Sequence, residues 1–206
     1  MVQYKRKFVE EQGRDWFTAD LHFDDDRLNL YGRDLVFKSK EEYAKNIIKN
    51  FNNVIMPNDN LYIVGDVSFT PEGFEYLNRL NCGKFLIKGN YDDSSKTAKF
   101  PITDDFLRKY FHGIYDDLYK NLCMKEDVYI NHYPTNGKGD IFNIVGHIHG
   151  TWKVQRNMIN VGVDAWHFRP VSDKMILWQI NGIRNHYDQN VFAGELSCNL
   201  ANKPEV

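Results

Sequence analysis

The chain of 206 residues is 42% hydrophobic and 15% aromatic, and its 26 basic and 28 acidic residues give a net charge of −2 at pH 7. This length and apolar content suit one domain with a sizeable core, and the aromatic content argues against disorder. No apolar run approaches the ~20 residues of a membrane-spanning helix, and the near-neutral charge gives no support to broad electrostatic binding of nucleic acid. The basic N-terminus has no apolar stretch behind it, so a secretory signal is not expected.

The three cysteines, Cys82, Cys123 and Cys198, are widely separated and form no Cys-x-x-Cys pair. This spacing excludes a zinc ribbon and a thioredoxin-type redox site. A disulfide framework is not expected in a chain of this length with so few thiols. We therefore expect buried hydrophobic cysteines in a reducing cytoplasm.

The first half of the chain alternates predicted strands with predicted helices. Three short runs bounded by Gly, Asn or Asp are predicted strands: residues 16–19, 61–64 and 84–87. The first helix begins at Ser39, which forms a capping-box pattern with Glu42, and continues on apolar residues at helical spacing as far as Val54. A shorter helix opens at Pro71 and ends near Leu80. This βαβαβ order predicts a partly parallel sheet.

The second half has apolar runs joined by short links, without a long helix between them. Four of these runs are predicted strands: residues 127–130, 141–145, 158–161 and 175–178. A helix is expected from Asp104 to Tyr110. The tail after Ile180 is rich in Asn and weakly periodic, so the structure of residues 181–206 is left open. The sequence predicts a second, β-rich sheet within a single domain over residues 1–206.

Polar side chains that can bind metals follow five of the predicted strands. In chain order the motifs are Asp20-Leu21-His22, Gly65-Asp66, Gly89-Asn90-Tyr91-Asp92, Asn131-His132 and Gly146-His147-Ile148-His149. Ligands of α/β sheets bind beyond the carboxyl ends of parallel strands, so these side chains are expected to converge. Oxygen and imidazole donors without cysteine suit divalent cations and disfavour a structural zinc site.

The spacing within the motifs predicts how the ligands are grouped. In an extended Asp-x-His or His-x-His segment, residues i and i+2 point the same way. Asp20 and His22 are therefore expected to hold one ion, and His147 and His149 to reach the same cluster. Asp66 is the expected bridge between two ions, because a carboxylate has two oxygens. Each motif alone is also typical of a turn or of an ordinary histidine, and it is the ordered set of five that favours a metal site.

This ordered set resembles the motifs of the calcineurin-like metallophosphoesterases, and residues 160–166 and 169–172 resemble the small bacterial and phage-encoded branch of that superfamily. The resemblance implies an α/β (α+β) fold of αββα type, in which a two-sheet β sandwich is flanked by helices and holds two divalent ions between its sheets. Manganese is the first expectation, with iron, zinc, nickel, cobalt and magnesium as alternatives. The implied ligands are Asp20, His22, Asp66 and His149 for one ion, and Asp66, Asn90, His132 and His147 for the other.

The resemblance implies hydrolysis of phosphodiesters, phosphomonoesters or pyrophosphates, in the cytoplasm of a bacterium or a phage-infected host. Two ions ~3.5–4 Å apart clamp the attacking and leaving oxygens, and a water between them loses a proton near neutral pH. Small nucleotide-like phosphorylated substrates are favoured because no cap domain is evident. The alternatives are a nuclease and a metal- or nucleotide-binding scaffold without turnover. No membrane partner is expected, and the oligomeric state is left open.

One departure from the family pattern concerns the proton donor. Tyr91 stands where most family members have the histidine that is assigned to protonate the leaving oxygen, and tyrosine is a weaker acid at neutral pH. The expected catalytic residues are Asn90, Tyr91 and Asp92. Three alternatives follow: Tyr91 itself donates a proton or a hydrogen bond, His112 takes over this role, or the substrate has a leaving group that needs little protonation. The third alternative is favoured. Alternatively, Tyr91 only shapes the pocket. Asp92 is expected to orient Tyr91 or a metal-bound group, or to cap the next turn.

A second departure is the acidic run Asp24-Asp25-Asp26, which is expected to be a solvated loop. If the run faces the site, it disfavours highly anionic substrates. Arg169 is expected either to contact phosphate or to form a salt bridge. The remaining histidines of interest, His167 and His186, are expected on the surface.

Overall fold

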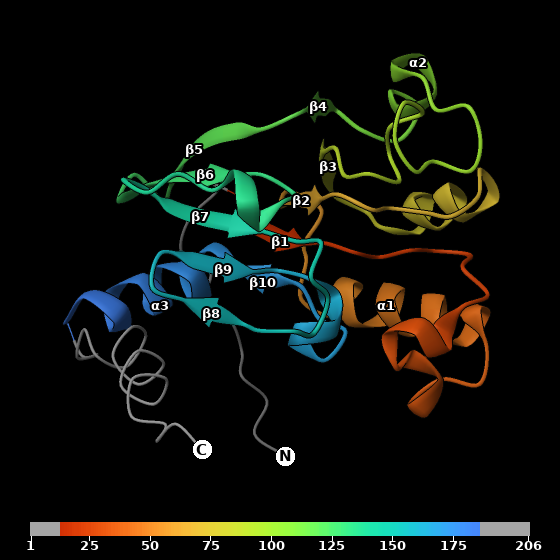
Figure 1. Ribbon diagram of the computed structural model, residues 1–206, viewed down its shortest axis with the longest axis horizontal. Helices are drawn as coiled ribbons and strands as arrows, with labels where there is room; N and C mark the ends of the chain where they lie inside the picture. Colours follow the sequence, from red (N-terminus) through yellow and green to blue (C-terminus); the bar gives the residue numbers. More distant parts are fainter. Residues whose placement is uncertain (1–12, 186–206) are drawn as a thin grey trace, which may run out of the picture.

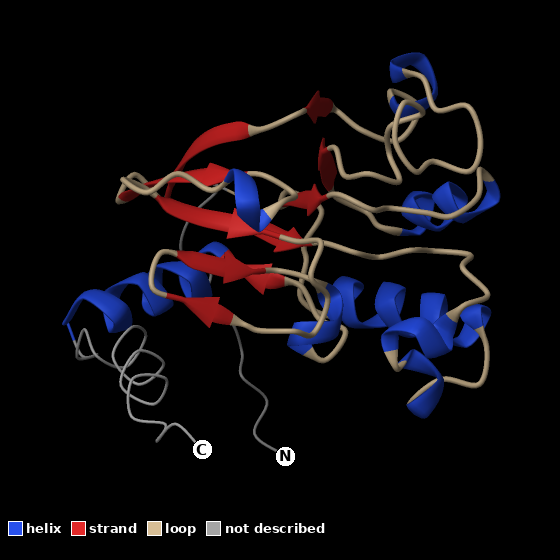
Figure 2. Cartoon of the chain, viewed as in Figure 1, coloured by secondary structure: helices blue, strands red, loops and turns tan. Residues whose placement is uncertain are grey.

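The computed structural model describes residues 13–185, which form two five-stranded sheets flanked by helices (Figures 1 and 2). The first sheet has the order β10-β1-β2-β3-β4, with strands Val171–Ser172, Asp15–Thr18, Asn60–Val64, Gly83–Ile87 and Gly113–Tyr115. The second has the order β5-β6-β7-β9-β8, with strands Leu118–Leu122, Glu126–Ile130, Phe142–Val145, Met158–Asn160 and Val154–Gln155. The predicted α/β fold with a two-sheet sandwich is confirmed.

Three α-helices and five 3-10 helices connect the strands within residues 13–185. The α-helices are α1 (Lys40–Asn52), α2 (Asp104–Leu107) and α3 (Asp173–Asn185). The 3-10 helices are η1 (Leu28–Tyr31), η2 (Arg33–Leu35), η3 (Glu72–Arg79), η4 (Pro134–Asn136) and η5 (Val163–Trp166). The helix predicted from Asp104 to Tyr110 is thus shorter than expected, and the one predicted after Pro71 is a 3-10 helix.

Parallel strands form the centre of both sheets. The strands β1, β2, β3 and β4 pair in parallel, and β10 adds an antiparallel edge. In the other sheet β6, β7 and β9 are parallel, whereas β5 and β8 are antiparallel edges. The arrows of β7 and β9 point the same way as those of β1 and β2 (Figure 2). The carboxyl ends of central strands from both sheets therefore lie on one side of the molecule.

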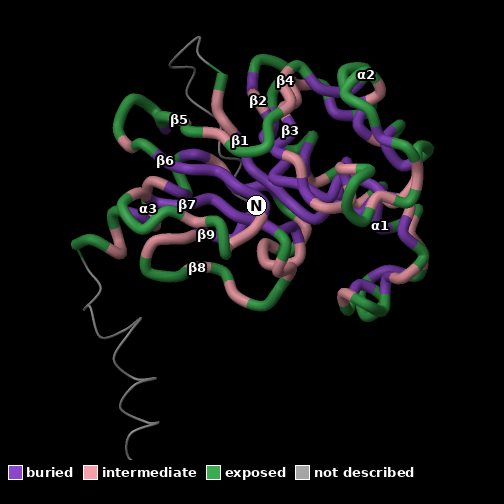
Figure 3. Tube along the Cα trace, turned by 45° about the horizontal axis from the view of Figure 1, so that its top comes forward, coloured by how far each residue is buried: buried purple, intermediate pink, exposed green. Residues whose placement is uncertain are grey.

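The side chains of β2 show how one strand serves two cores. Leu61 and Ile63 pack against the helices, while Tyr62 and Val64 pack against the second sheet. This alternation follows from the period of two along a strand. The central strands are accordingly buried on both faces (Figure 3). A parallel sheet covered on both faces produces the near-continuous apolar runs seen in the sequence.

Helix α1 begins where the sequence predicts. The Ser39 side chain accepts a hydrogen bond from the Glu42 N–H at 3.2 Å, which is the expected N-cap contact. The Glu42 carboxylate reaches the N–H of Lys38 at 2.8 Å rather than that of Ser39. The capping box is therefore displaced by one residue. The helix ends before Val54, which packs against the core from the following loop.

The strand predicted at residues 175–178 is wrong, because this segment lies inside α3. Ile176 and Ile180 are buried at helical spacing, whereas Met175 and Trp178 are 42% and 62% exposed. The helix continues to Asn185 and so includes the first five residues of the unassigned tail. The rest of that tail, together with Cys198 and His186, lies outside the described residues.

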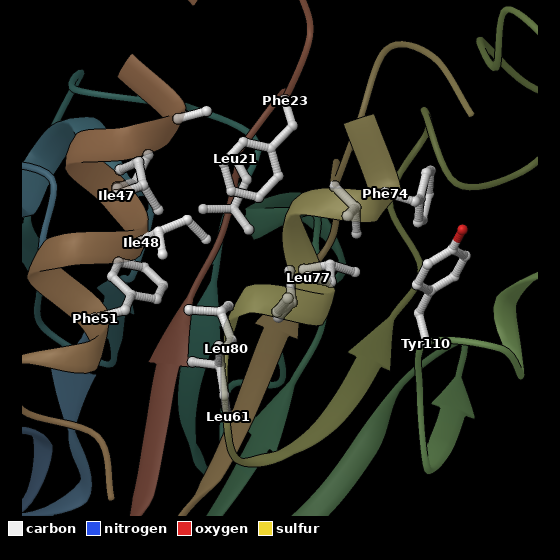
Figure 4. Packing of buried hydrophobic residues seen from close by; sticks show 14 of the residues in the cluster. Leu21, Phe23, Ile47, Ile48, Phe51, Leu61, Phe74, Leu77, Leu80 and Tyr110 are labelled. Carbon is white, nitrogen blue, oxygen red and sulfur yellow. The ribbon is translucent and has the colours of Figure 1, made fainter. Parts of the chain in front are cut away.

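The loop after β1 is anchored by its apolar residues. Leu21 and Phe23 are fully buried in the core between α1 and η3, where they face Ile47 and Leu77 (Figure 4). Since they alternate with the polar residues of the Asp-x-His motif, this packing fixes the loop without occupying the polar side chains.

The two sheets are joined at the carboxyl end of β1. Ala19 forms a parallel bridge with Gly162, which follows β9. The Ala19 N–H donates to the Val161 carbonyl and the Val163 N–H donates to the Ala19 carbonyl, both at 3.0 Å. The last strand residues of the two sheets therefore have fixed relative positions at this point. Within residues 13–185, no helix has both the length and the apolarity needed to cross a membrane.

Candidate metal centre

The five polar motifs follow β1, β2, β3, β6 and β7, as the sequence predicts. They bring six His and Asp side chains together as two triads: Asp20, His22 and His149, and Asp66, His132 and His147. The candidate ligand atoms of each triad lie within 4.8 Å of one another. The predicted convergence beyond the strand ends is therefore present in the structure.

Asp66 connects the two triads through a single oxygen. Its Oδ2 lies 3.5 Å from His22 Nε2 and 3.4 Å from His132 Nε2. Its Oδ1 accepts a hydrogen bond from the Tyr91 N–H at 2.9 Å, which fixes the carboxylate. Oδ2 is therefore placed to bridge two cations by itself, whereas the sequence predicts a bridge that uses both carboxylate oxygens.

The Nε2 atom of His132 faces a group of hydrogen-bond acceptors, where it can hold either a proton or a cation. Its Nδ1 lies 2.8 Å from the Val64 carbonyl, and since a carbonyl only accepts, Nδ1 carries the proton. In the neutral ring Nε2 is then unprotonated, and it faces Asn90 Oδ1 at 3.3 Å and His147 Nδ1 at 3.2 Å, besides Asp66. Metal-ligating histidines characteristically donate their other ring N–H to a carbonyl or carboxylate.

His22 is the buried group whose environment points most directly to a cation. It is 1% exposed, and neither ring nitrogen has a hydrogen-bond partner among residues 13–185. Buried polar atoms are nearly always paired, so two unpaired nitrogens on one ring call for a specific explanation. Divalent cations fit the donor set of imidazole, carboxylate and amide groups without thiolate.

The ligand residues converge through left-handed backbone rather than through strand alternation. The φ angles of Asp20, His22, Asp66, His147 and His149 lie between 43° and 73°. The expectation that i and i+2 side chains point the same way in extended segments is therefore wrong. Asp20 and His22 nevertheless share a triad, as expected, whereas His147 and His149 fall into different triads. Left-handed non-glycine residues are uncommon and cluster at functional sites.

Two glycines allow the strand ends to approach. At Gly65, which has a φ of 86°, an added Cβ would lie 2.2 Å from His132 Nδ1. At Gly146, an added Cβ would lie 2.5 Å from the Ala19 Cβ. Any side chain at either position would push apart the strands that carry the ligands.

Burial and neighbouring charges shift the proton affinities of the triads in different directions. Burial raises the pKa of Asp20 to about 6 and lowers the pKa of His22 to about 3. Burial also opposes protonation of His132, but the carboxylates of Asp66 and Asp20 outweigh it and raise the His132 pKa to about 9. Burial opposes ionisation of Asp66, yet contact with His132 holds its pKa well below the usual range. Without a cation, the cluster therefore keeps a proton on His132.

An ion-pair network behind the first triad was not predicted. His149 Nδ1 donates to Asp164 Oδ2 at 2.7 Å, and Arg33 Nε and Nη2 donate to the two oxygens of Asp164 at 2.8 and 2.9 Å. Arg33 is 1% exposed and also donates to the Asp20 carbonyl at 2.6 Å. Tyr31 covers the same triad, with its ring stacked on those of His22 and His149 at 5.0 and 4.2 Å. No short motif marks these contacts, because the partners are far apart in sequence.

The residues of the Gly89-Asn90-Tyr91-Asp92 motif have separate roles. Asn90 Oδ1 lies at the second triad, near His132. The buried Asp92 accepts backbone N–H groups from Asp66, Gly89 and Val67 at 2.7, 2.9 and 3.1 Å. Because these contacts fix the loops after β2 and β3, Asp92 is a positioning residue.

Tyr91 occupies a place between the metal-ligand cluster and a cationic residue. Its ring lies edge-on to His22, with centroids 5.0 Å apart, and its hydroxyl accepts a hydrogen bond from Arg27 at 3.4 Å. The prediction that His112 replaces Tyr91 as the donor is wrong. His112 Nδ1 accepts the Lys84 N–H at the start of β3, whereas Asn90 and Tyr91 follow the opposite end of that strand.

The acidic run is only in part the solvated loop that the sequence suggests, because the Asp26 side chain is 84% exposed whereas Asp25 is buried. Asp25 is 2% exposed and forms an ion pair with Arg27. Asp24 and Asp26 share the ammonium group of Lys40 at 2.8 and 3.0 Å. These two cations offset two of the three negative charges of the run and so weaken the expected bias against anionic substrates.

Two residues after β9 lie on the surface. Both Arg169 and His167 are exposed, as predicted for the histidine. Among residues 13–185 no carboxylate pairs with Arg169, so the alternative of a salt bridge finds no support there.

Protein-family profiles give no match to this chain. The uncharacterized protein MJ1445 of Methanocaldococcus jannaschii is 27% identical over 173 residues, which are 79% of this chain and 88% of that protein. Among solved structures, the crystal structure of the protein of unknown function AQ665 from Aquifex aeolicus is similar with a TM-score of 0.64 and 25% identity. That similarity covers 82% of this chain and 100% of the other. Neither name states an activity.

We expect cation binding to displace the proton that His132 holds. The His132 pKa is raised to about 9, so at pH 8 most of the cation-free protein carries this proton. His132 must lose it from Nε2 before that atom can bind a cation. Affinity for Mn²⁺ should therefore rise with pH and level off above pH 9. Calorimetry at pH 8 in buffers of different ionisation enthalpy should show about one proton released per chain. A heat of binding that is independent of the buffer would contradict this expectation.

Proposed function

We propose that this protein is a divalent-metal-dependent phosphoesterase that acts on small, nucleotide-like phosphorylated substrates. The observation that carries the proposal is the shared Asp66 Oδ2 between two triads of imidazole and carboxylate groups. When bound, two divalent cations lower the pKa of water and neutralise the charge of a phosphoryl group. Manganese is the preferred metal, with iron, zinc, nickel, cobalt and magnesium as alternatives.

The residues around the triads support this assignment. Asp20, His22, Asp66, Asn90, His132, His147 and His149 would hold the cations. Backbone contacts hold several of these ligands in advance of any cation, as when both oxygens of Asp20 accept the His147 N–H at 2.9 and 3.0 Å. Cys82 is half-buried and Cys123 is exposed, so the expectation that these cysteines are buried is wrong. Both are free thiols, which supports a reducing cytoplasm as the site of action.

The test begins with chelated, cation-free protein. On adding Mn²⁺ we expect two equivalents to bind per chain, and hydrolysis of 4-nitrophenyl phosphate or bis(4-nitrophenyl) phosphate to appear and to disappear again with chelator. Both esters have leaving groups that need little protonation, which suits the absence of a histidine at Tyr91. Two bound equivalents with turnover of neither ester would favour the scaffold, and cleavage of a single-stranded oligonucleotide alone would favour the nuclease.

A further inference from the structure

Arg27 is held rigidly beside the candidate metal centre. Its Nε and Nη2 donate to the two oxygens of Asp25 at 2.9 and 2.7 Å, and its own backbone N–H donates to Asp25 Oδ1 at 2.9 Å. Asp25 is 2% exposed, so its carboxylate depends on this partner. The bidentate contact fixes the plane of the guanidinium group.

The other contacts of the Arg27 guanidinium group leave its Nη1 group available as a hydrogen-bond donor. Its central carbon lies 4.4 Å from the centre of the Phe69 ring, and Nη2 also donates to the Tyr91 hydroxyl at 3.4 Å. Nη1 forms no hydrogen bond with any of residues 13–185, and the Arg27 side chain is 40% exposed. A guanidinium group fixed on one edge and one face, with a free NH₂ group, is preorganised to bind an anion.

Tyr91 links Arg27 to the bridging carboxylate. The Tyr91 N–H donates to Asp66 Oδ1 and its hydroxyl accepts from Arg27, so a single residue separates the shared ligand from the guanidinium group. Two more cations lie on this rim. Lys99 Nζ is 5.8 Å from the Phe69 ring, and Lys96 Nζ is 5.4 Å from the ring of Tyr133, which contacts His132 and His147. Arg27 is paired with Asp25 and Lys96 with Asp93 at 3.6 Å, so Lys99 is the cation of this rim that has no carboxylate partner among residues 13–185.

We propose that Arg27 binds the leaving phosphate of a phosphoanhydride substrate; this inference rests on the proposed phosphoesterase function. The oxygen of a water that has lost one proton bonds to phosphorus, and the bond from phosphorus to the bridging oxygen breaks. The departing phosphate keeps the electron pair. Arg27 stabilises that charge through hydrogen bonds from Nη1, so the leaving group departs without a proton from Tyr91.

The position of the Arg27 guanidinium group favours a phosphoanhydride substrate over a simple phosphate ester. The cations at the two triads would neutralise the attacked phosphoryl group, so a further fixed cation assists only a substrate with a second anionic group next to the first. Phosphate is also a leaving group that needs no proton, which suits a site where tyrosine replaces an imidazole acid. A phosphomonoester of a neutral alcohol lacks both properties.

Binding of two phosphonates tests the role of Arg27 without turnover. Calorimetry on Mn²⁺-loaded protein compares methylenediphosphonate, which has two linked anionic groups, with methylphosphonate, which has one. For Arg27→Met we expect affinity for methylenediphosphonate to fall about 10-fold to 100-fold, the range for loss of a charged hydrogen bond. Affinity for methylphosphonate should change by less than about 3-fold. Arg184→Met is the matched control, because it removes a bidentate pair with Glu126 outside the site.

Two further variants keep the test decisive if Arg27→Met fails to fold. Arg27→Lys retains the charge without the planar fork, and Asp25→Asn releases the guanidinium group; each should weaken methylenediphosphonate binding selectively. Binding of both phosphonates as in the unaltered protein would overturn the role of Arg27, whatever the activity. Selective loss of binding in a protein that hydrolyses neither pyrophosphate nor 4-nitrophenyl phosphate would instead overturn the phosphoesterase function and leave the Arg27 anion site standing.

Discussion

Asp66→Asn is expected to abolish metal-dependent hydrolysis while leaving the fold intact. The asparagine can keep the acceptor for the Tyr91 N–H, but its amide nitrogen then stands between His22 and His132 in place of Oδ2. An amide nitrogen does not bridge cations, so at most one equivalent of Mn²⁺ should bind. The loss of several kcal/mol of charge stabilisation corresponds to at least about 10³-fold in rate.

Calorimetric stoichiometry and ester hydrolysis, measured on the same preparation, check this expectation. Asp105→Asn provides the control, because Asp105 is an exposed carboxylate paired only with Arg108 on α2. The cation-free Asp66→Asn protein should remain folded but unfold at a lower temperature than the unaltered chain, because the contact that lowers the pKa of Asp66 and raises that of His132 is lost. Retention of two equivalents of Mn²⁺ with full activity would rule out the bridging role.

Arg33→Met should lower the free energy of unfolding by about 3–5 kcal/mol, the range for removing one partner of a buried ion pair. Arg33 lies between the rings of Tyr31 and Tyr43, with its central carbon 4.9 and 4.5 Å from their centres, and is paired with Asp164. Its loss would leave the Asp164 carboxylate buried without its cation and the Asp20 carbonyl without its donor. Urea denaturation should show a lower midpoint at unchanged slope.

The control for this expectation is again Arg184→Met, because the Arg184 side chain is 56% exposed and its ion pair with Glu126 should contribute about 1 kcal/mol. A double variant, Arg33→Met with Asp164→Leu, should recover part of the loss because no charge remains buried. If Arg33→Met loses no more stability than Arg184→Met, the network does not support the site.

The sequence predicts the candidate ligands better than the way in which they meet. His147 and Asp66 follow strands whose apolar runs and flanking glycines are visible in the sequence, so their convergence is predictable from parallel topology. The left-handed backbone at His22 and His149 leaves no comparable signal, because a local conformation of this kind is imposed by tertiary contacts. The Arg33–Asp164 pair was missed for a related reason, since 131 residues separate its partners.

The segment at residues 175–178, predicted as a strand, is preceded by a residue that favours the start of a helix. A short apolar run fits a buried strand or a buried helix equally well. Ser172 resolves the ambiguity in the structure, because its hydroxyl accepts the Met175 N–H at 3.2 Å, which is typical of the residue that starts a helix. Ile176 and Ile180 then continue at a spacing of four residues.

The bridge between Ala19 and Gly162 helps to hold the candidate ligand residues in place before any cation binds. Because it fastens the two sheets beside Asp20, the ligand cage is assembled by the same hydrogen bonds that hold the sandwich together. If the proposed cations bind here, they would meet ligands that are already in place, and little of the binding free energy would be spent on ordering the polypeptide.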